Sequence, residues 1–183
     1  GQTLGLTGFG ASAHLVLALA RHRYPHSPVV VFARSPEERA FALELGAVWA
    51  GDTRDRPPQP CAAIIDTTPA WTPVAEALKN LQAGGRLVIN AIRKESADQS
   101  VLLELDYPEQ LWREKEIKSV ANVTRRDVRE FLQLAAEIPL RPEVACYPLE
   151  EANRALVELK RSHVRGAKVL VIGAGVAGLA AIG

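Results

Sequence analysis

The chain has 183 residues, 48% of them hydrophobic and 23% charged, as in an ordinary globular protein. Its 22 Lys and Arg residues balance 21 Asp and Glu residues, and a net charge of +1 gives no field that would attract nucleic acid or an anionic membrane. The two cysteines are too few for a disulfide framework, no signal peptide is evident, and no apolar run reaches the roughly 18–20 residues of a membrane span. We therefore expect a cytoplasmic protein with neither a nucleic-acid partner nor a membrane partner.

Strands and helices are predicted to alternate along almost the whole chain. Short apolar runs predict strands at residues 3–7, 29–33, 48–50, 61–66, 86–92, 117–121, 144–147 and 168–172. Helices are expected at residues 11–21, 36–45, 73–81 and 149–161, and after Thr124. This alternation predicts an α/β fold, a doubly wound parallel sheet with helices on both faces, known as the Rossmann fold.

Three local signals mark the boundaries of these elements. Ser35 and Pro36 begin the second helix, where Glu38 is expected to complete a capping box with Ser35. Gly84-Gly85 is expected to end the third helix before the strand at 86–92. The charged residues 93–100 interrupt the pattern.

A glycine loop, Gly8-Phe9-Gly10-Ala11-Ser12-Ala13, follows the first strand and opens the first helix. In this setting, one glycine permits a tight turn and the other lets the backbone approach a pyrophosphate, while the start of the helix offers free N–H groups. The loop therefore predicts a dinucleotide site. The alternative is a glycine turn that serves only packing.

Arg34 and Ser35 follow the second strand, where an acidic residue would bind the ribose hydroxyls of NAD. An arginine can instead form charge-assisted hydrogen bonds with a 2′-phosphate. This position favours NADP(H) over NAD(H). The alternative is that Arg34 is a solvated cation and Ser35 only a helix cap.

Several motifs resemble the cofactor-binding domain of medium-chain, zinc-binding alcohol dehydrogenases. The resemblance covers roughly Gly1 to Ile172 and includes Gly8–Ala13, Ser35–Arg39, Leu45–Ala47, Gly84–Arg86, Leu111–Glu114, Ile117–Asn122, Thr124–Val128, Pro148–Asn153 and Gly166–Ile172. It implies that the chain is the NADP(H)-binding part of an oxidoreductase that exchanges hydride with an alcohol–aldehyde pair.

The resemblance also implies a set of cofactor contacts. Gly8, Phe9, Gly10, Ala11 and Ser12 would hold the pyrophosphate, Arg34 and Ser35 would meet the adenosine end, Thr67, Thr68 and Pro69 would lie under the cofactor, and Asn90, Ala91 and Ile92 would approach the nicotinamide. For Thr67 and Thr68, simple capping of the next helix is the alternative.

In that family the zinc and the substrate pocket belong mainly to a domain that precedes the glycine loop. The two cysteines and four histidines show no metal-ligand spacing, so we expect that this chain binds no zinc, has no catalytic residue and is inactive in isolation. His14 is expected on the helix surface near the phosphates.

Three segments are expected along the chain. Residues 1–142 would form the dinucleotide-binding domain, and 143–172 a strand–helix–strand that returns to a missing catalytic domain. Without that partner the latter strands would be disordered, pack on their own sheet, or pair with another molecule, as in a homodimer. Residues 173–183 would form a truncated second glycine loop, Gly173–Gly178. The stretch from Lys168 resembles the start of the NAD-binding region of the transhydrogenase alpha subunit and of alanine dehydrogenase, which implies a fusion to a transhydrogenase-like protein.

Two other classes of function stay open from the sequence. One is a non-catalytic nucleotide-sensing or assembly module of a transhydrogenase-like protein. The other is an S-adenosylmethionine-dependent transferase, which Arg34 disfavours because an acid is expected at the end of its second strand. Fold analogy alone does not decide between them.

Overall fold

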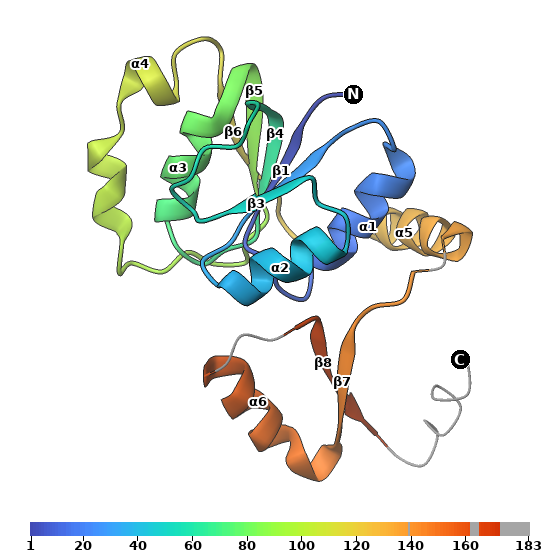
Figure 1. The fold of residues 1–183 in the computed structure, drawn as a ribbon. Helices are drawn as coiled ribbons and strands as arrows, with labels where there is room; N and C mark the ends of the chain where they lie inside the picture. The colour runs from blue at the N-terminus through green and yellow to red at the C-terminus, as the bar shows by residue number, and fades with distance from the viewer. Residues whose placement is uncertain (139, 162–164, 173–183) are drawn as a thin grey trace.

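A computed structural model describes residues 1–138, 140–161 and 165–172 of the chain (Figure 1). Its main body is a six-stranded parallel sheet in the order β3-β2-β1-β4-β5-β6. The strands are β1 (Leu4–Thr7), β2 (Val29–Phe32), β3 (Trp49–Gly51), β4 (Cys61–Asp66), β5 (Leu81–Ile89) and β6 (Glu116–Ser119). The helices are α1 (Ala13–Arg23), α2 (Pro36–Glu44), α3 (Thr72–Asn80), α4 (Tyr107–Gln110) and α5 (Arg125–Glu137), with a 3₁₀ turn at Gln99–Glu104. The predicted doubly wound α/β fold is confirmed.

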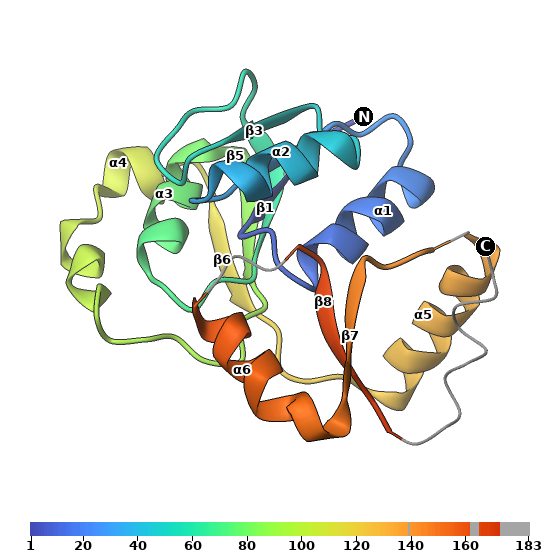
Figure 2. The same ribbon diagram turned by 60° about the horizontal axis from the view of Figure 1, so that its bottom comes forward.

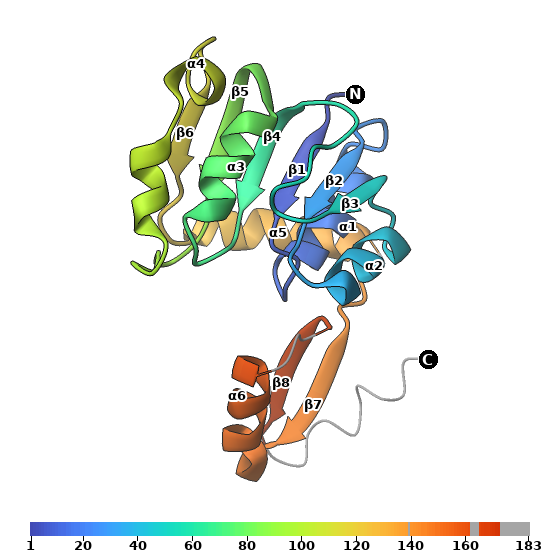
Figure 3. The same ribbon diagram turned by 60° about the vertical axis from the view of Figure 1, so that its left-hand side comes forward.

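Strand β2 shows why a strand in the middle of the sheet is apolar at every position. Val29 and Val31 belong to a core shared with α1 and α2, whereas Val30 and Phe32 belong to a core shared with α3. Because side chains alternate across a strand, a strand covered on both faces must be apolar at every position. Figure 3 shows α3 on one side of the sheet and α1 and α5 on the other.

The residues before β5 differ from the prediction. Helix α3 ends at Asn80 and β5 begins at Leu81, so the Gly84-Gly85 pair lies inside the strand and does not end the helix. Cys61 pairs with Leu81 but Ala63 pairs with Arg86, and this shift of register is absorbed around Gly84, whose φ is +68°. Pairing with β4 has overridden the local preference of glycine for a turn. The strand also ends at Ile89, before the predicted end at residue 92.

Two smaller predictions also need correction. Ser35 Oγ accepts from the N–H of Glu38 at 3.3 Å, but no reciprocal bond from the Glu38 side chain completes the box among the described residues; Ser35 Oγ donates instead to Glu37. His14 is 4% exposed and not on the surface, because its ring packs beside Phe41 of α2, with ring centroids 6.1 Å apart.

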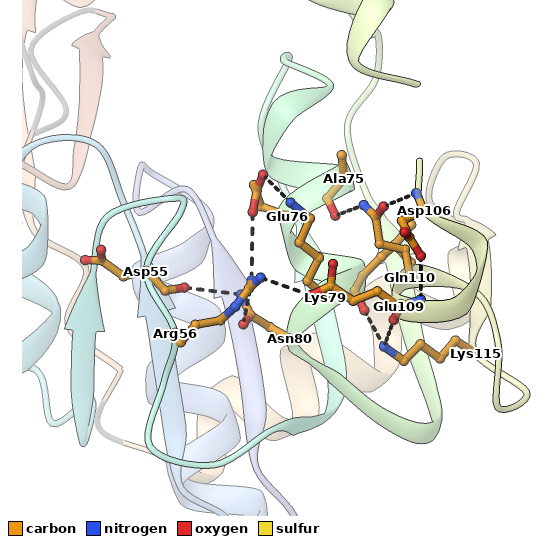
Figure 4. Close-up of polar contacts among 11 residues, drawn as sticks. Asp55, Arg56, Ala75, Glu76, Lys79, Asn80, Asp106, Glu109, Gln110 and Lys115 are labelled. Carbon is orange, nitrogen blue, oxygen red and sulfur yellow. Dashed lines mark hydrogen bonds and ion pairs between the residues drawn. The ribbon is translucent and has the colours of Figure 1, made fainter. Parts of the chain in front are cut away.

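A polar network fixes α4 against α3 near the start of β5 (Figure 4). Arg56 contacts Asn80, Glu76 and Glu109, at 3.3, 3.8 and 3.3 Å. Lys115 Nζ donates to the carbonyls of Leu78 and Glu109, at 2.8 and 2.7 Å. These contacts lie at the amino ends of the strands, because Asn80 directly precedes β5.

The last described segment is a separate strand–helix–strand unit (Figure 2). β7 (Val144–Pro148) and β8 (Ala167–Val171) pair with each other in parallel, and between them lie a 3₁₀ turn (Leu149–Glu151) and α6 (Ala152–Arg161). β7 and β8 thus form a two-stranded sheet of their own. Arg165 links the unit to α2 through Glu44 at 2.7 Å and lies over the Phe41 ring.

Candidate functional site

A cavity of about 600 Å³ lies at the carboxyl ends of the sheet strands. Residues after β1, β2, β3 and β4 line it, together with the segment after β5; they include Gly8, Phe9, Gly10, Arg34, Asp52, Arg54, Thr68, Pro69, Ala70, Glu95 and Asp98. In open parallel sheets this edge is where ligands bind, at the point where the strand order reverses. Here that point falls between β1 and β4.

The glycine loop is built to keep backbone exposed at the cavity. Gly8 has φ +77° and its N–H donates to the carbonyl of Phe32 at 2.8 Å, which fixes the turn after β1. A Cβ built on Gly10 would meet no atom within 4 Å, so open space adjoins this position. Ser12 is the N-cap residue of α1, but its side chain accepts no hydrogen bond from the helix. The N–H groups of the first turn are therefore not capped by the Ser12 side chain.

The part of the cavity beside β2 and β3 is lined by two arginines and two carboxylates, namely Arg34, Arg54, Glu38 and Asp52. Arg34 is exposed, and its guanidinium makes no hydrogen bond or ion pair with any other residue that the structure describes. Arg39 Nη1 donates to the carbonyls of Ala33 and Arg34, at 2.8 and 3.0 Å, and so holds the backbone at the end of β2. Asp52 pairs with Arg39 at 3.5 Å and not with Arg34.

Other predicted site residues have different placements. Ser35 is buried at the cap of α2, and Thr67 Oγ1 donates to the Thr7 carbonyl at 3.0 Å; neither lines the cavity. Thr68 and Pro69 do line it. Ala11 borders a second hollow beside α6, and Ser12 caps α1. Asn90, Ala91 and Ile92 follow β5 outside the cavity wall, with the Ile92 side chain fully exposed.

The sequence interpretation missed three charged residues at this edge. Asp66, Lys94 and Asp98 lie in or behind the cavity wall, and Asp66 is fully buried. Burial by itself raises the pKa of Asp98, but hydrogen bonds from the N–H groups of Trp71 and Thr72 and from the Thr72 hydroxyl lower it below its usual range. A charged residue at the end of an apolar strand, as Asp66 is, was the one available signal.

Among the described residues, no group of three or more His, Cys, Asp or Glu side chains could hold a metal ion. No helix within the described ranges is both long and apolar enough to cross a bilayer. The second glycine loop, Gly173–Gly178, lies outside the described residues.

The strand order and the glycine loop define the class as a Rossmann-type α/β domain. No family model matches the sequence. The chain is 39% identical over 174 residues to a Mycobacterium tuberculosis protein described as "Probable alcohol dehydrogenase AdhA", covering 94% of this chain and 48% of that one.

Solved structures agree on the fold. The alcohol dehydrogenase of Aeropyrum pernix superposes with a TM-score of 0.76 at 22% identity, over 94% of this chain and 50% of that chain. Acetophenone reductase of Geotrichum candidum, solved in complex with NAD, gives 0.71 at 17% identity, over 93% and 48%. The chain therefore has a Rossmann-type fold, is similar to alcohol dehydrogenases, and spans about half the length of the proteins it matches.

Proposed function

We propose that this chain binds NADP(H), in preference to NAD(H), as the cofactor-binding part of an alcohol-dehydrogenase-like oxidoreductase. In the complete enzyme the nicotinamide would exchange hydride with an alcohol–aldehyde pair. The observation that supports this most directly is that the Gly8–Gly10 loop shares one cavity with the Arg34 guanidinium, which pairs with no other residue in the described part of the chain.

The residues present fit a dinucleotide. The open space beside Gly10 and the uncapped first turn of α1 suit a pyrophosphate that approaches backbone N–H groups. Arg34 would form charge-assisted hydrogen bonds with the 2′-phosphate. Thr68 and Pro69 would contact the half of the cofactor that lies over β4. These residues bind and orient the cofactor.

A preference for NAD(H) would rest on the carboxylates of Glu38 and Asp52, since both line the same part of the cavity. Either could accept hydrogen bonds from the ribose hydroxyls of NAD(H), and either would repel a 2′-phosphate. Asp52 is engaged by Arg39, which reduces its effect, and the Arg34 guanidinium in the same cavity is why we favour NADP(H).

Calorimetric titration of the chain with NADPH and NADH tests the proposal. We expect tighter binding of NADPH, and we expect Arg34→Ala to weaken NADPH by about tenfold or more, the size of a charge-assisted hydrogen bond, with NADH nearly unchanged. Arg129→Ala is the matched control, because Arg129 is an exposed arginine of α5 that lines no part of the cavity. Equal or NADH-favouring binding would remove the role of Arg34, and binding of neither would refute cofactor binding by this chain.

Fusion to a transhydrogenase-like protein, or service as its nucleotide-sensing module, stays a prediction from residues 168–183 of the sequence. A complete zinc-binding domain in the full-length protein would favour the enzyme, and its absence would favour the sensor.

A further inference from the structure

A buried ion pair lies behind the cavity wall, between Asp66 at the end of β4 and Lys94 in the segment after β5. The Asp66 side chain is 0% exposed and the Lys94 side chain 10%. The Lys94 ammonium also donates to the carbonyls of Thr68 and Ala70, at 2.9 and 2.8 Å. An ammonium has three N–H donors, so every donor of Lys94 has an acceptor within the protein.

Asp66 is equally committed to its neighbours. Its Oδ1 accepts from the hydroxyls of Thr7 and Thr68, at 2.6 and 2.7 Å, while Oδ2 takes the bond from Lys94. The pair therefore joins the end of β1, the loop after β4 and the segment after β5. A buried ion pair generally stabilises a fold no better than a well-packed apolar pair, so its stability alone does not explain it.

The same two segments are joined at further points. The N–H of Glu95 donates to the carbonyl of Pro69 at 2.8 Å. Asp98 accepts from the N–H groups of Trp71 and Thr72, at 2.9 and 2.7 Å. Residues 66–72 and 94–98 thus form one cross-linked wall, which we call the β4–β5 wall. Its members Thr68, Pro69, Ala70, Glu95 and Asp98 face the cavity, whereas Lys94 does not line it.

The β4–β5 wall and the arginines occupy different parts of the cavity. Arg34 and Arg54 follow β2 and β3, and the wall follows β4 and β5. A doubly wound sheet consists of two mononucleotide-binding halves, which meet where the strand order reverses. If the adenosine half of a dinucleotide lies over β1–β3, its other half must lie against the β4–β5 wall.

We propose that Lys94, held by Asp66, is a positioning residue that sets the β4–β5 wall for the nicotinamide mononucleotide half of the cofactor. This inference rests on the proposed function. Lys94 acts through the Thr68 and Ala70 carbonyls and does not touch the ligand. A wall fixed before binding reduces the ordering cost of the ligand half that contacts it.

Two ligands separate this role from a general effect on folding. NADPH contains both halves, whereas 2′,5′-ADP contains only the adenosine half with its phosphates. Calorimetry should show that Lys94→Met weakens NADPH about tenfold, which corresponds to about 1.4 kcal/mol, and changes 2′,5′-ADP less than about twofold. Lys79→Met is the matched control, because Lys79 pairs with Glu76 on α3 and lines no part of this cavity.

The double variant Asp66→Asn/Lys94→Met covers the case in which Lys94→Met fails to fold with an unpaired buried carboxylate. It removes both charges but cannot restore the bonds to the Thr68 and Ala70 carbonyls, so NADPH should stay weakened. Unchanged NADPH affinity in the variants, an equal loss for both ligands, or full recovery in the double variant would overturn the inference. If the unsubstituted chain binds neither ligand, the proposed function itself fails.

Discussion

Gly8 and Thr68 meet where β1 and β4 end: a Cβ built on Gly8 would lie 2.9 Å from Cγ2 of Thr68 and 3.2 Å from Oγ1 of Thr67. Gly8 also has φ +77°, which side-chain-bearing residues rarely adopt. The lack of room for a Cβ atom and the positive φ therefore both require glycine at position 8. The turn that presents the loop to the cavity is consequently fixed by the neighbouring strand.

Gly8→Ala should therefore destabilise the chain. Backbone strain and the clash with Thr68 act together, and we expect the free energy of unfolding to fall by about 1–3 kcal/mol. Urea denaturation monitored by tryptophan fluorescence measures the change. A loss below about 0.5 kcal/mol would show that the turn adapts to a side chain.

Gly10→Ala should separate binding from stability. Its Cβ meets nothing within 4 Å and its φ lies outside the left-handed region, so we expect the free energy of unfolding to stay within about 0.5 kcal/mol of that of the unsubstituted chain. The methyl group would nevertheless occupy the space beside the loop and weaken NADPH binding at least tenfold. Unchanged affinity in titration would argue that the loop serves packing alone.

Asp98→Ala should destabilise α3 by about 1 kcal/mol at neutral pH, because the carboxylate accepts the N–H groups of Trp71 and Thr72 at the start of that helix. The pKa of Asp98 is lowered in the folded state, although burial alone would raise it. Its contribution is thus present above the ordinary carboxyl pKa of about 4 and is lost as pH falls through the folded value.

Urea denaturation at pH 7 and at pH 3 checks this dependence. The difference between the unsubstituted chain and Asp98→Ala should shrink at the lower pH. Asp98→Asn, which keeps an acceptor oxygen, should lose less than Asp98→Ala at pH 7. An equal difference at both pH values would contradict the ionised cap.

Cys61 and Cys146 should differ in reactivity. Burial raises the pKa of the Cys61 thiol to about 12, whereas Cys146 is exposed on β7. Since the thiolate is the nucleophile, iodoacetamide at pH 8 should label Cys146 in the folded chain, and Cys61 only after unfolding in urea. Peptide mass spectrometry measures both rates, and equal labelling in native buffer would contradict the burial of Cys61.

The raised pKa of Cys61 also gives stability a pH dependence at the alkaline end. The contribution is complete below the ordinary thiol pKa of about 8.5 and falls as pH rises towards about 12. Cys61→Ala should reduce the free energy of unfolding at pH 8 and reduce this alkaline loss. An identical slope in both proteins would assign the loss to other groups.

Local pattern predicted β2 and β4 well because both strands are short and neither contains an exposed residue. The predicted strand at 61–66 agrees with β4 residue for residue, and the predicted run at 29–33 contains β2. Period and polarity suffice for such strands, because each residue must be apolar whatever face it meets. The glycine loop was equally predictable, since the six residues that define it are consecutive in the sequence.

Long-range contacts account for what the sequence did not predict. Lys94 and Asp98 belong to a charged stretch that looks solvated, but their partners lie 24–28 residues earlier in the chain. Gly84-Gly85 has the local signature of a helix end, and pairing with β4 overrides it. His14 is polar, yet Phe41 covers it from another helix.

The direct passage from α3 at Asn80 to β5 at Leu81 has a consequence for where the chain can be cut. With no linker between them, and with both residues buried, a protease cannot draw this junction into its active site unless helix and strand come apart together. The loop between β3 and β4, in which Arg54, Asp55 and Arg56 are exposed, offers a much more accessible target. Limited digestion should therefore yield fragments that divide before β4 and keep α3 and β5 in one piece.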